Sequence, residues 1–333
     1  MTQARTRARS AGVLRLLGTV VGVVTLLAGG VGIAAHYFGF ASTGWTLIAS
    51  FTPLFIVVTV VALVVLVALR RRLLAVTAAA VLVAGLAGQV PLYFAETPTA
   101  SDAPQIRLMQ ANIFLGQADT AALVRTVRDR DVDLLTVSEL TVGAVQRLTA
   151  DGLDNELPYS FLRPREGGGG TGIFSRYPLS DGAALPGFVL TNLRAKVAIP
   201  NTSPTAVYAL HPLPPFPEPA YRWMGELREL RRLLGAEALP FVVGADFNST
   251  WDHQQYRQVL DGAGAPAIRD AAEYVGAGIV TTYPANRWYP AILAIDRILT
   301  RGGTPISFSR TDIPGSDHYG VIGEVRLDGS VDA

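Results

Sequence analysis

The feature that most constrains this chain is a long uncharged stretch near its N-terminus. No Asp, Glu, Lys or Arg occurs between Arg15 and Arg70. Such a stretch is too long for one membrane-spanning helix and suits two helices joined by a short turn. A third apolar run follows the triplet Arg70-Arg71-Arg72. We therefore expect residues 1–95 to form a membrane anchor with three transmembrane helices, at about 16–38, 45–69 and 73–94.

The basic residues predict how these helices are oriented. Residues 1–95 hold seven arginines, grouped at the N-terminus and in the triplet, and no other charged residue. Both groups are expected in the cytoplasm, because positive charge stays on that side of the membrane. The N-terminus is then cytoplasmic, and residues beyond 95 emerge on the extracytoplasmic side. A cleaved signal peptide explains only the first apolar run, since two more of spanning length follow. The arginine- and alanine-rich composition favours a bacterial plasma membrane.

Beyond residue 95 the composition becomes that of a globular domain. Residues 96–104 are polar and contain proline, which predicts a linker, and residues 105–333 form the expected domain. Apolar runs of strand length alternate there with two amphipathic stretches, Ala118–Arg130 and Tyr221–Leu234. The strand-length runs are Ile106–Phe114, Val132–Val137, Gly172–Phe174, Leu193–Ile199, Thr205–Leu210, Phe241–Gly244, Ile295–Leu299 and Tyr319–Val325. This alternation predicts a layered α/β domain. The chain has no cysteine, which excludes disulfides, a cysteine nucleophile and thiolate metal sites.

Polar side chains stand at the ends of several of these runs. They are Asn112, Glu139, His211, Asp246, Asn248, Asp296, Asp317 and His318. Functional groups collect at strand ends and the adjoining loops, where rigid backbone holds them. Carboxylate and amide oxygens suit a hard cation such as Mg²⁺. Each residue alone also has an ordinary explanation as a turn residue, a helix cap or part of a surface ion pair.

Seven short motifs in a fixed order resemble those of the endonuclease/exonuclease/phosphatase superfamily. They are Gln110-Ala111-Asn112, Ser138-Glu139, Gly172-Ile173-Phe174-Ser175-Arg176, His211-Pro212, Gly244-Ala245-Asp246-Phe247-Asn248, Ile295-Asp296-Arg297-Ile298 and Ser316-Asp317-His318. The resemblance spans about residues 105–327. It implies a deoxyribonuclease I-like, four-layer α/β sandwich in which two mixed β-sheets pack together and helices flank them. Ser138 is a departure, because many members have glutamine there, but that position is not a ligand.

The resemblance also implies which residues bind metal. Glu139 resembles the principal Mg²⁺ ligand, with Asn112 beside it, and Asp317 resembles a second polar ligand near the metal. Mn²⁺ is the alternative ion. A metal surrounded by hydrogen-bond donors suits phosphoryl transfer, which is catalysed mainly by positioning and charge neutralisation.

The remaining motif residues resemble the catalytic groups of the superfamily. Asp246 matches the aspartate that orients or deprotonates the attacking water, and Asn248 matches the asparagine that positions it. His318 matches the histidine that contacts the phosphoryl oxygens, and Asp296 would hold that imidazole in one tautomer. His211 matches the histidine that protonates the leaving oxygen.

The substrate is predicted less directly than the reaction. Beyond residue 95, 21 basic residues face 27 acidic ones, a net charge of −6, and this argues against a nuclease of long polymers. The anchor and the His211–Pro215 segment resemble actinobacterial membrane proteins linked to glycopeptide resistance. That resemblance implies a lipid pyrophosphate substrate such as undecaprenyl pyrophosphate. Four further residues are candidates for substrate contact: Arg194, Lys196, Tyr283 and Arg287.

Two other functions stay open at this stage. One is an extracytoplasmic nuclease or phosphodiesterase that scavenges phosphate. The other is a non-catalytic sensor on the same fold, which the complete set of polar residues disfavours, because a binding module has no need for both Asp246 and an Asp296–His318 pair.

Overall fold

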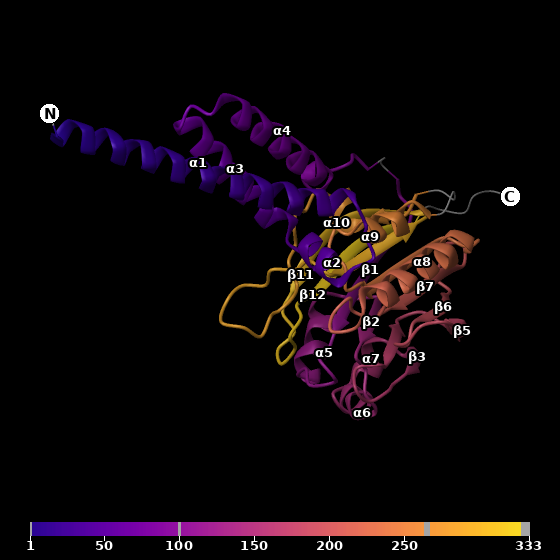
Figure 1. Cartoon of the computed structure of the whole chain (residues 1–333). Coiled ribbons are helices and arrows are strands. Elements are labelled where there is room, and N and C mark those ends of the chain that lie inside the picture. The colour runs from indigo at the N-terminus through magenta and orange to yellow at the C-terminus, as the bar shows by residue number, and fades with distance from the viewer. Residues whose placement is uncertain (1, 99–100, 263–266, 328–333) are drawn as a thin grey trace. The chain divides into compact units, whose positions relative to one another are not determined.

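The computed structural model describes residues 2–98, 101–262 and 267–327. The chain divides into two compact units. The first contains the residues up to Val90 together with Asp252–Gln254, and the second contains Pro91–Trp251 and the residues from Gln255 onward. Figure 1 labels the elements of both units.

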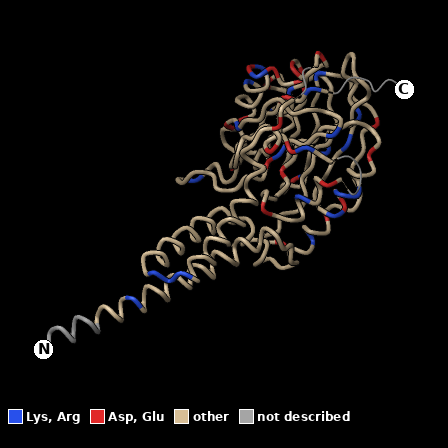
Figure 2. The backbone as a smooth tube through the Cα atoms, turned by 90° about the horizontal axis from the view of Figure 1, so that it is seen from above, with Lys and Arg blue, Asp and Glu red and all other residues tan. Residues whose placement is uncertain are grey.

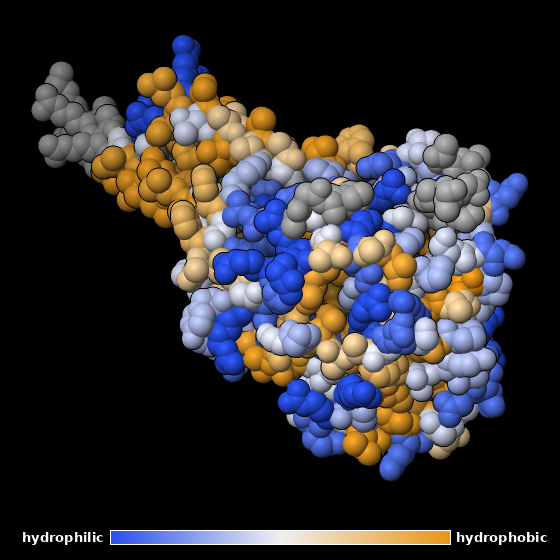
Figure 3. Space-filling model, turned by 90° about the vertical axis from the view of Figure 1, so that its right-hand side faces the viewer, coloured by the Kyte–Doolittle hydropathy of each residue, from blue (hydrophilic) through white to orange (hydrophobic). Residues whose placement is uncertain are grey.

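The first unit is helical, and its helices carry no charged residue between Arg15 and Arg70. Its helices are α1 (Thr2–Tyr37), α2 (Thr43–Ser50), α3 (Thr52–Ala68) and α4 (Arg72–Gln89). Glycines let α1 and α3 approach closely: a Cβ atom on Gly22 would lie 2.8 Å from the Leu66 side chain. The backbone tube carries no charge between Arg15 and Arg70 (Figure 2), and the surface of these helices is largely hydrophobic (Figure 3). Apolar surface of this kind on long helices indicates contact with lipid.

The helices correct the expectation of three transmembrane helices. Two segments, Ser10–Tyr37 and Arg72–Tyr93, are long and apolar enough to cross a membrane. The expected continuous helix at 45–69 is wrong, because α2 and α3 meet at an angle of 72°. The break lies at Phe51, and Pro53 stands in the first turn of α3. Proline has no N–H to donate to the preceding turn, so the helix cannot continue unbroken through it.

The second unit is built from two six-stranded mixed sheets. Sheet A has the order β11-β12-β1-β2-β4-β3, and sheet B has the order β5-β6-β7-β8-β10-β9. The strands of sheet A are β1 (Gln105–Asn112), β2 (Leu134–Ser138), β3 (Tyr159–Arg163), β4 (Thr171–Ser175), β11 (Gly303–Thr311) and β12 (Gly320–Leu327). Those of sheet B are β5 (Leu179–Ala184), β6 (Leu193–Val197), β7 (Thr205–Leu210), β8 (Phe241–Asp246), β9 (Arg269–Asp270) and β10 (Asp296–Arg301). The pairs β1/β2 and β7/β8 are parallel, and the other pairs are antiparallel.

Buried residues on both faces of each sheet create four layers. Leu108 of β1 and Val207 of β7 belong to the core between the sheets, whereas Met109 belongs to the core under α5. Helices α5 (Thr120–Asp129), α6 (Val142–Ala150) and α7 (Leu153–Glu156) cover sheet A, and α8 (Ala220–Ala236) and α9 (Gln254–Leu260) cover sheet B. A short helix, α10 (Ala271–Tyr274), follows β9. The expected four-layer sandwich of two mixed sheets is confirmed.

The second unit begins earlier than the sequence predicts. The 3-10 helix η1 (Val90–Tyr93) follows α4 directly, and Leu92 is buried in the core that also holds Trp223 of α8. The backbone N–H of Glu96 donates to Tyr274 O (2.9 Å), and that of Gly278 donates to Leu92 O (2.7 Å). The boundary therefore lies between Val90 and Pro91 rather than after residue 95. Residues 99–100 of the expected 96–104 linker lie outside the described residues.

Candidate active site

The topology of the two sheets brings the polar strand ends together. Parallel pairing aligns the ends of β1 and β2, with Asn112 opposite Ser138, and Glu139 follows at once. In sheet B, antiparallel pairing places Asp296 at the start of β10 opposite Asp246 at the end of β8. Parallel strands end at the same edge of a sheet, and an antiparallel neighbour begins there. Residues from distant parts of the sequence thus meet at one edge of the sandwich.

Asn112 links the carboxylates of the two sheets. Its fully buried side-chain amide donates to Glu139 Oε1 (3.1 Å) and to Asp246 Oδ2 (3.0 Å). The other oxygen of Glu139 accepts from the backbone N–H of Leu115 (2.6 Å). Glu139 has a φ of +60°, a conformation that costs energy for a residue with a side chain. The hydrogen bonds hold this conformation, so the carboxylate is fixed before any ligand arrives.

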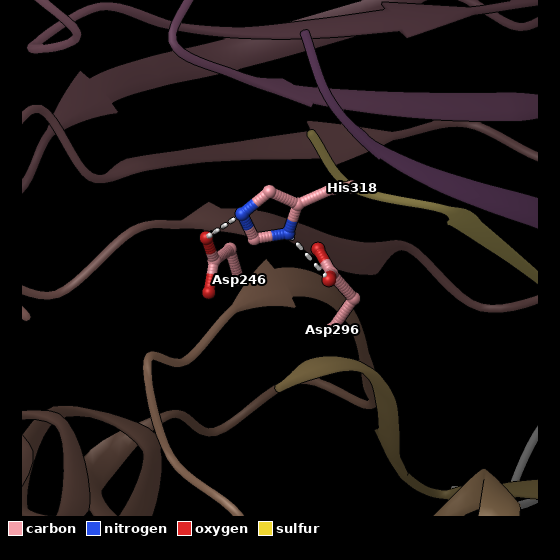
Figure 4. Close-up of side chains that lie close together, drawn as sticks. All are labelled: Asp246, Asp296 and His318. Atoms are coloured by element: carbon pink, nitrogen blue, oxygen red, sulfur yellow. Dashed lines mark hydrogen bonds and ion pairs between the residues drawn. The ribbon is translucent and has the colours of Figure 1, made fainter. Parts of the chain in front are cut away.

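His318 lies between two buried aspartates (Figure 4). Its Nδ1 donates to Asp296 Oδ2 (2.8 Å), and its Nε2 faces Asp246 Oδ2 at 3.7 Å. Burial alone would disfavour the charged imidazole, but the carboxylates of Asp296 and Asp246 outweigh it and raise the pKa of His318 to about 10. Both ring nitrogens therefore carry protons near neutral pH, and the ring is suited to hold negative charge on an oxygen.

A second histidine approaches Asp246 from β7. His211 follows that strand, is 4% exposed, and has its Nε2 3.7 Å from Asp246 Oδ2. Asn248 lies beside them: its backbone N–H donates to Asp246 Oδ1 (2.9 Å), and its side-chain amide donates to Pro212 O (3.0 Å). Among the described residues, the Asp246 carboxylate therefore contacts two hydrogen-bond donors and lies near two imidazoles.

The oxygen-rich part of this edge fits a hard divalent cation. Glu139, Asn112 and Asp317 all present oxygen atoms, which are the ligands that Mg²⁺ prefers. Asp317 Oδ1 is buried and has no hydrogen-bond partner among the described residues. Burial, followed by the charges of Glu139 and Asp246, raises the pKa of Asp317, although His318 opposes the shift. A cation at this point would satisfy both the free oxygen and the concentration of negative charge.

A different trio offers metal-binding atoms within 4.8 Å of one another, namely Asp246, Asp296 and His318. Their contacts with one another favour a hydrogen-bonded imidazole over a metal ligand at this point. Each imidazole nitrogen of His318 already faces a carboxylate, and the raised pKa keeps the ring protonated. A protonated nitrogen has no lone pair for a metal.

The four candidates for substrate contact separate into two groups. The ring of Tyr283 lies 4.8 Å from that of His318, and Arg287 lies on the exposed loop that follows Tyr283. Arg194 and Lys196 of β6 do not join the site. Arg194 Nε bonds Glu237 Oε2 (2.8 Å), and Lys196 Nζ pairs with Asp181 (2.7 Å). Both cations are already occupied by ion pairs.

Two positioning residues were not among the candidates. The Ser316 hydroxyl donates to Asn112 O (2.7 Å) and accepts from His318 N (3.1 Å), so it connects β1 to His318. The Thr282 hydroxyl accepts from the backbone N–H of Asp296 (3.3 Å). Each residue is adjacent in the sequence to a candidate, and only this adjacency could have identified it from the sequence.

Comparison with known proteins agrees with this arrangement. Residues 109–318 match the sequence profile of the Endonuclease/Exonuclease/phosphatase family. No curated protein matches the sequence.

Solved structures share the fold at low sequence identity. D. rerio TDP2 complexed with a single-strand DNA product has a TM-score of 0.53 and 19% identity, over 66% of this chain and 98% of that one. An endonuclease/exonuclease/phosphatase from Bacteroides vulgatus has a TM-score of 0.54 and 17% identity, over 67% and 99%. One from Beutenbergia cavernae has a TM-score of 0.51 and 17% identity, over 69% and 73%.

Proposed function

The chain belongs to the endonuclease/exonuclease/phosphatase family, and we propose that it is a membrane-anchored, divalent-metal-dependent phosphoesterase that acts on a lipid pyrophosphate such as undecaprenyl pyrophosphate. Members of the family are usually metal-dependent hydrolases of phosphate esters. The observation that carries the proposal is the single edge where Asp246 meets His318, His211 and Asn112. That set contains a base, two acids and a link to the metal-binding carboxylate.

The residues divide the reaction among them. Asp246 orients the attacking water and accepts its proton, and Asn248 holds that carboxylate in place. His318, kept protonated by Asp296, donates to a phosphoryl oxygen. His211 protonates the leaving oxygen as its bond to phosphorus breaks. Glu139, Asn112 and Asp317 would hold Mg²⁺, or Mn²⁺ as the alternative, and the bound ion supplies charge neutralisation of the phosphoryl group.

The start of the second unit supports a substrate in the membrane. Its core begins at Pro91, directly after a segment that is apolar enough to span. Leu92 is 1% exposed within that core, so no flexible linker separates the two. A catalytic domain that follows a spanning segment this closely in the sequence works within reach of lipid headgroups, which favours a lipid substrate over phosphate scavenging.

Charge supports an extracytoplasmic location. The N-terminal arginines and Arg70–Arg72 both belong in the cytoplasm by the positive-inside rule. α3 has 17 residues, which reach about 25 Å, at the lower limit for crossing a bilayer. If α2 and α3 form one bent span, three crossings in a bacterial plasma membrane leave the catalytic domain outside. A role in glycopeptide resistance would follow from that location and substrate.

The test uses the full-length protein in detergent with Mg²⁺. Phosphate release from undecaprenyl pyrophosphate is measured for the native chain, for Asp246→Ala, and for Asp154→Asn as the matched control on exposed α7. We expect Asp246→Ala to lose about a thousandfold or more in turnover, because it removes the base, and the control to keep it. EDTA should abolish the activity.

Three results would overturn parts of the proposal. Native turnover in Asp246→Ala would remove the catalytic assignment. Cleavage of single-stranded DNA or a soluble phosphodiester without lipid hydrolysis would leave the chemistry but move the function to phosphate scavenging. Binding of these phosphates with no turnover of any would favour a sensor.

A further inference from the structure

A loop beside the catalytic histidine projects from the second unit, near β11 in Figure 1. It comprises residues 284–292, and its base is closed by the pairing of Tyr283 with Leu293. The N–H groups of Ile292 and Leu293 both donate to Tyr283 O (2.9 Å). The N–H of Ala285 donates to Asp317 O (2.7 Å), and the Tyr283 ring lies 4.8 Å from that of His318. The base of the loop is therefore part of the rim of the active site.

The outer part of the loop exposes a tryptophan. The Trp288 side chain is 95% exposed, more than any other large apolar side chain in the part of the chain that the structure describes. Its ring meets Tyr289 edge-on, with centroids 5.5 Å apart, and Ile292 on the same loop is 49% exposed. Burying an aromatic side chain is favourable, so leaving one exposed costs free energy. A fully solvent-exposed tryptophan on a loop beside the active site therefore indicates a binding surface.

The chemistry of the loop suits a lipid–water interface. Arg287, Trp288 and Tyr289 are consecutive, and Trp and Tyr gather at membrane interfaces because their rings are apolar at one end and polar at the other. Arginine adds attraction to anionic headgroups. Two more exposed apolar side chains stand close in sequence to site groups: Leu115 (43% exposed), whose N–H bonds Glu139, and Phe216 (61%), which closely follows Pro212.

The direct attachment of the domain to a spanning segment indicates that the loop binds the bilayer. The core of the second unit begins at Pro91, and the spanning segment Arg72–Tyr93 runs into it without a linker. The domain is therefore tethered directly to a segment that is apolar enough to lie in a bilayer. We infer that the 284–292 loop inserts Trp288 into the bilayer interface and holds the mouth of the active site at the level of lipid headgroups. This inference rests on the proposed function as a membrane-bound phosphoesterase.

The absence of cysteine gives a direct test. Trp288→Cys would be the only thiol in the full-length chain and can carry an environment-sensitive fluorophore. The matched control is Ala183→Cys, exposed on the edge strand β5. Both proteins are placed in nanodiscs of phosphatidylcholine and phosphatidylglycerol, with or without nitroxide-labelled phosphatidylcholine. We expect the label at 288 to shift to the blue and to be quenched by the nitroxide lipid, as interfacial insertion predicts. The label at 183 should do neither.

Activity provides the second readout. Trp288→Ala should lower kcat/KM for a lipid pyrophosphate in the nanodiscs by about tenfold, which corresponds to about 1.4 kcal/mol. It should leave hydrolysis of a soluble phosphodiester unchanged.

The outcomes separate this inference from the function. A label at 288 that is quenched no more than the one at 183 overturns the inference, even if the lipid is hydrolysed. Quenching at 288 without hydrolysis of any lipid phosphate supports the loop and rejects the lipid substrate. Quenching that appears only after the lipid pyrophosphate is added overturns insertion into the bilayer. It would indicate that the loop binds the hydrocarbon chain of the substrate.

Discussion

Replacing Asp270 by asparagine should destabilise the second unit through one buried charge. Asp270 is fully buried on β9, and its Oδ2 accepts from Arg297 Nη1 (3.2 Å) and from the Tyr256 hydroxyl (2.7 Å). Its Oδ1 caps α10 by accepting from Ala272 N (2.9 Å). Asparagine keeps the shape and one of the two accepting oxygens, so the substitution removes the charge and one acceptor. Arg297, which is 3% exposed, is left without its direct counter-ion.

The structure sets the expected size of this effect. Breaking a buried ion pair by removing one partner costs about 3–5 kcal/mol. Glu273 lies near enough to interact electrostatically with both Arg297 and Asp270, so it offsets part of the loss. We therefore expect the free energy of unfolding to fall by about 3 kcal/mol, the lower end of that range.

Denaturant unfolding of the full-length protein in mild detergent, followed by tryptophan fluorescence, measures this loss. The informative control is the double variant Asp270→Asn with Arg297→Met, which removes both charges. We expect it to recover at least half of the loss, because a buried pair replaced by neutral groups is often tolerated. A loss below about 1 kcal/mol in the single variant, or no recovery in the double variant, would refute the reasoning.

Two further predictions concern ionisable groups of the same domain. Burial, with the charges of Asp270 and Glu96, raises the pKa of Glu273 from 4.5 to about 7. The folded state then keeps this proton to higher pH than the unfolded state, so the contribution to stability is present below about pH 4.5 and is lost as the pH rises through about 7. After allowance for its partial exposure, Glu273→Gln should raise the free energy of unfolding by about 1–2 kcal/mol at about pH 8 and change it little at about pH 5; equal effects in thermal unfolding at both pH values would contradict this. Asp296→Asn should lower turnover by about a hundredfold to ten-thousandfold, because His318 loses the charge that keeps it protonated and oriented; native turnover would reject the assigned role.

The sequence predicted the inner strands of both sheets but missed the outer ones. The four strands without a predicted counterpart are β3, β5, β9 and β11, and each lies at an edge of its sheet. Inner strands are buried on both faces and form continuous apolar runs, as in β8, where every residue is buried. An edge strand mixes polar and apolar residues: in β5, all residues after the first are exposed. Its pairing partner, not its own composition, makes it a strand.

The polar residues of the site were predicted for a related reason. A carboxylate such as Asp246 or Asp296 next to a buried strand must have a partner, so its position alone signals a function. The positions of the arginine and lysine side chains in the sequence did not indicate their roles in this way. Whether Arg194 is free or paired depends on Glu237, which is distant in the sequence and reaches it only in the folded domain. The break at Phe51 was missed because apolar composition measures length in a membrane but not straightness. Pro53 was the available signal.

The position of Asn112 has a consequence for how activity can be lost. Its amide spans from a carboxylate of sheet A to a carboxylate of sheet B, with 3.1 Å and 3.0 Å on the two sides. A sliding of one sheet against the other by about 1 Å would break one of these bonds, since hydrogen bonds weaken steeply beyond about 3.5 Å. We therefore expect turnover to be sensitive to small shifts of one sheet relative to the other. We expect core substitutions far from Asn112 to abolish turnover while the strands remain fully paired.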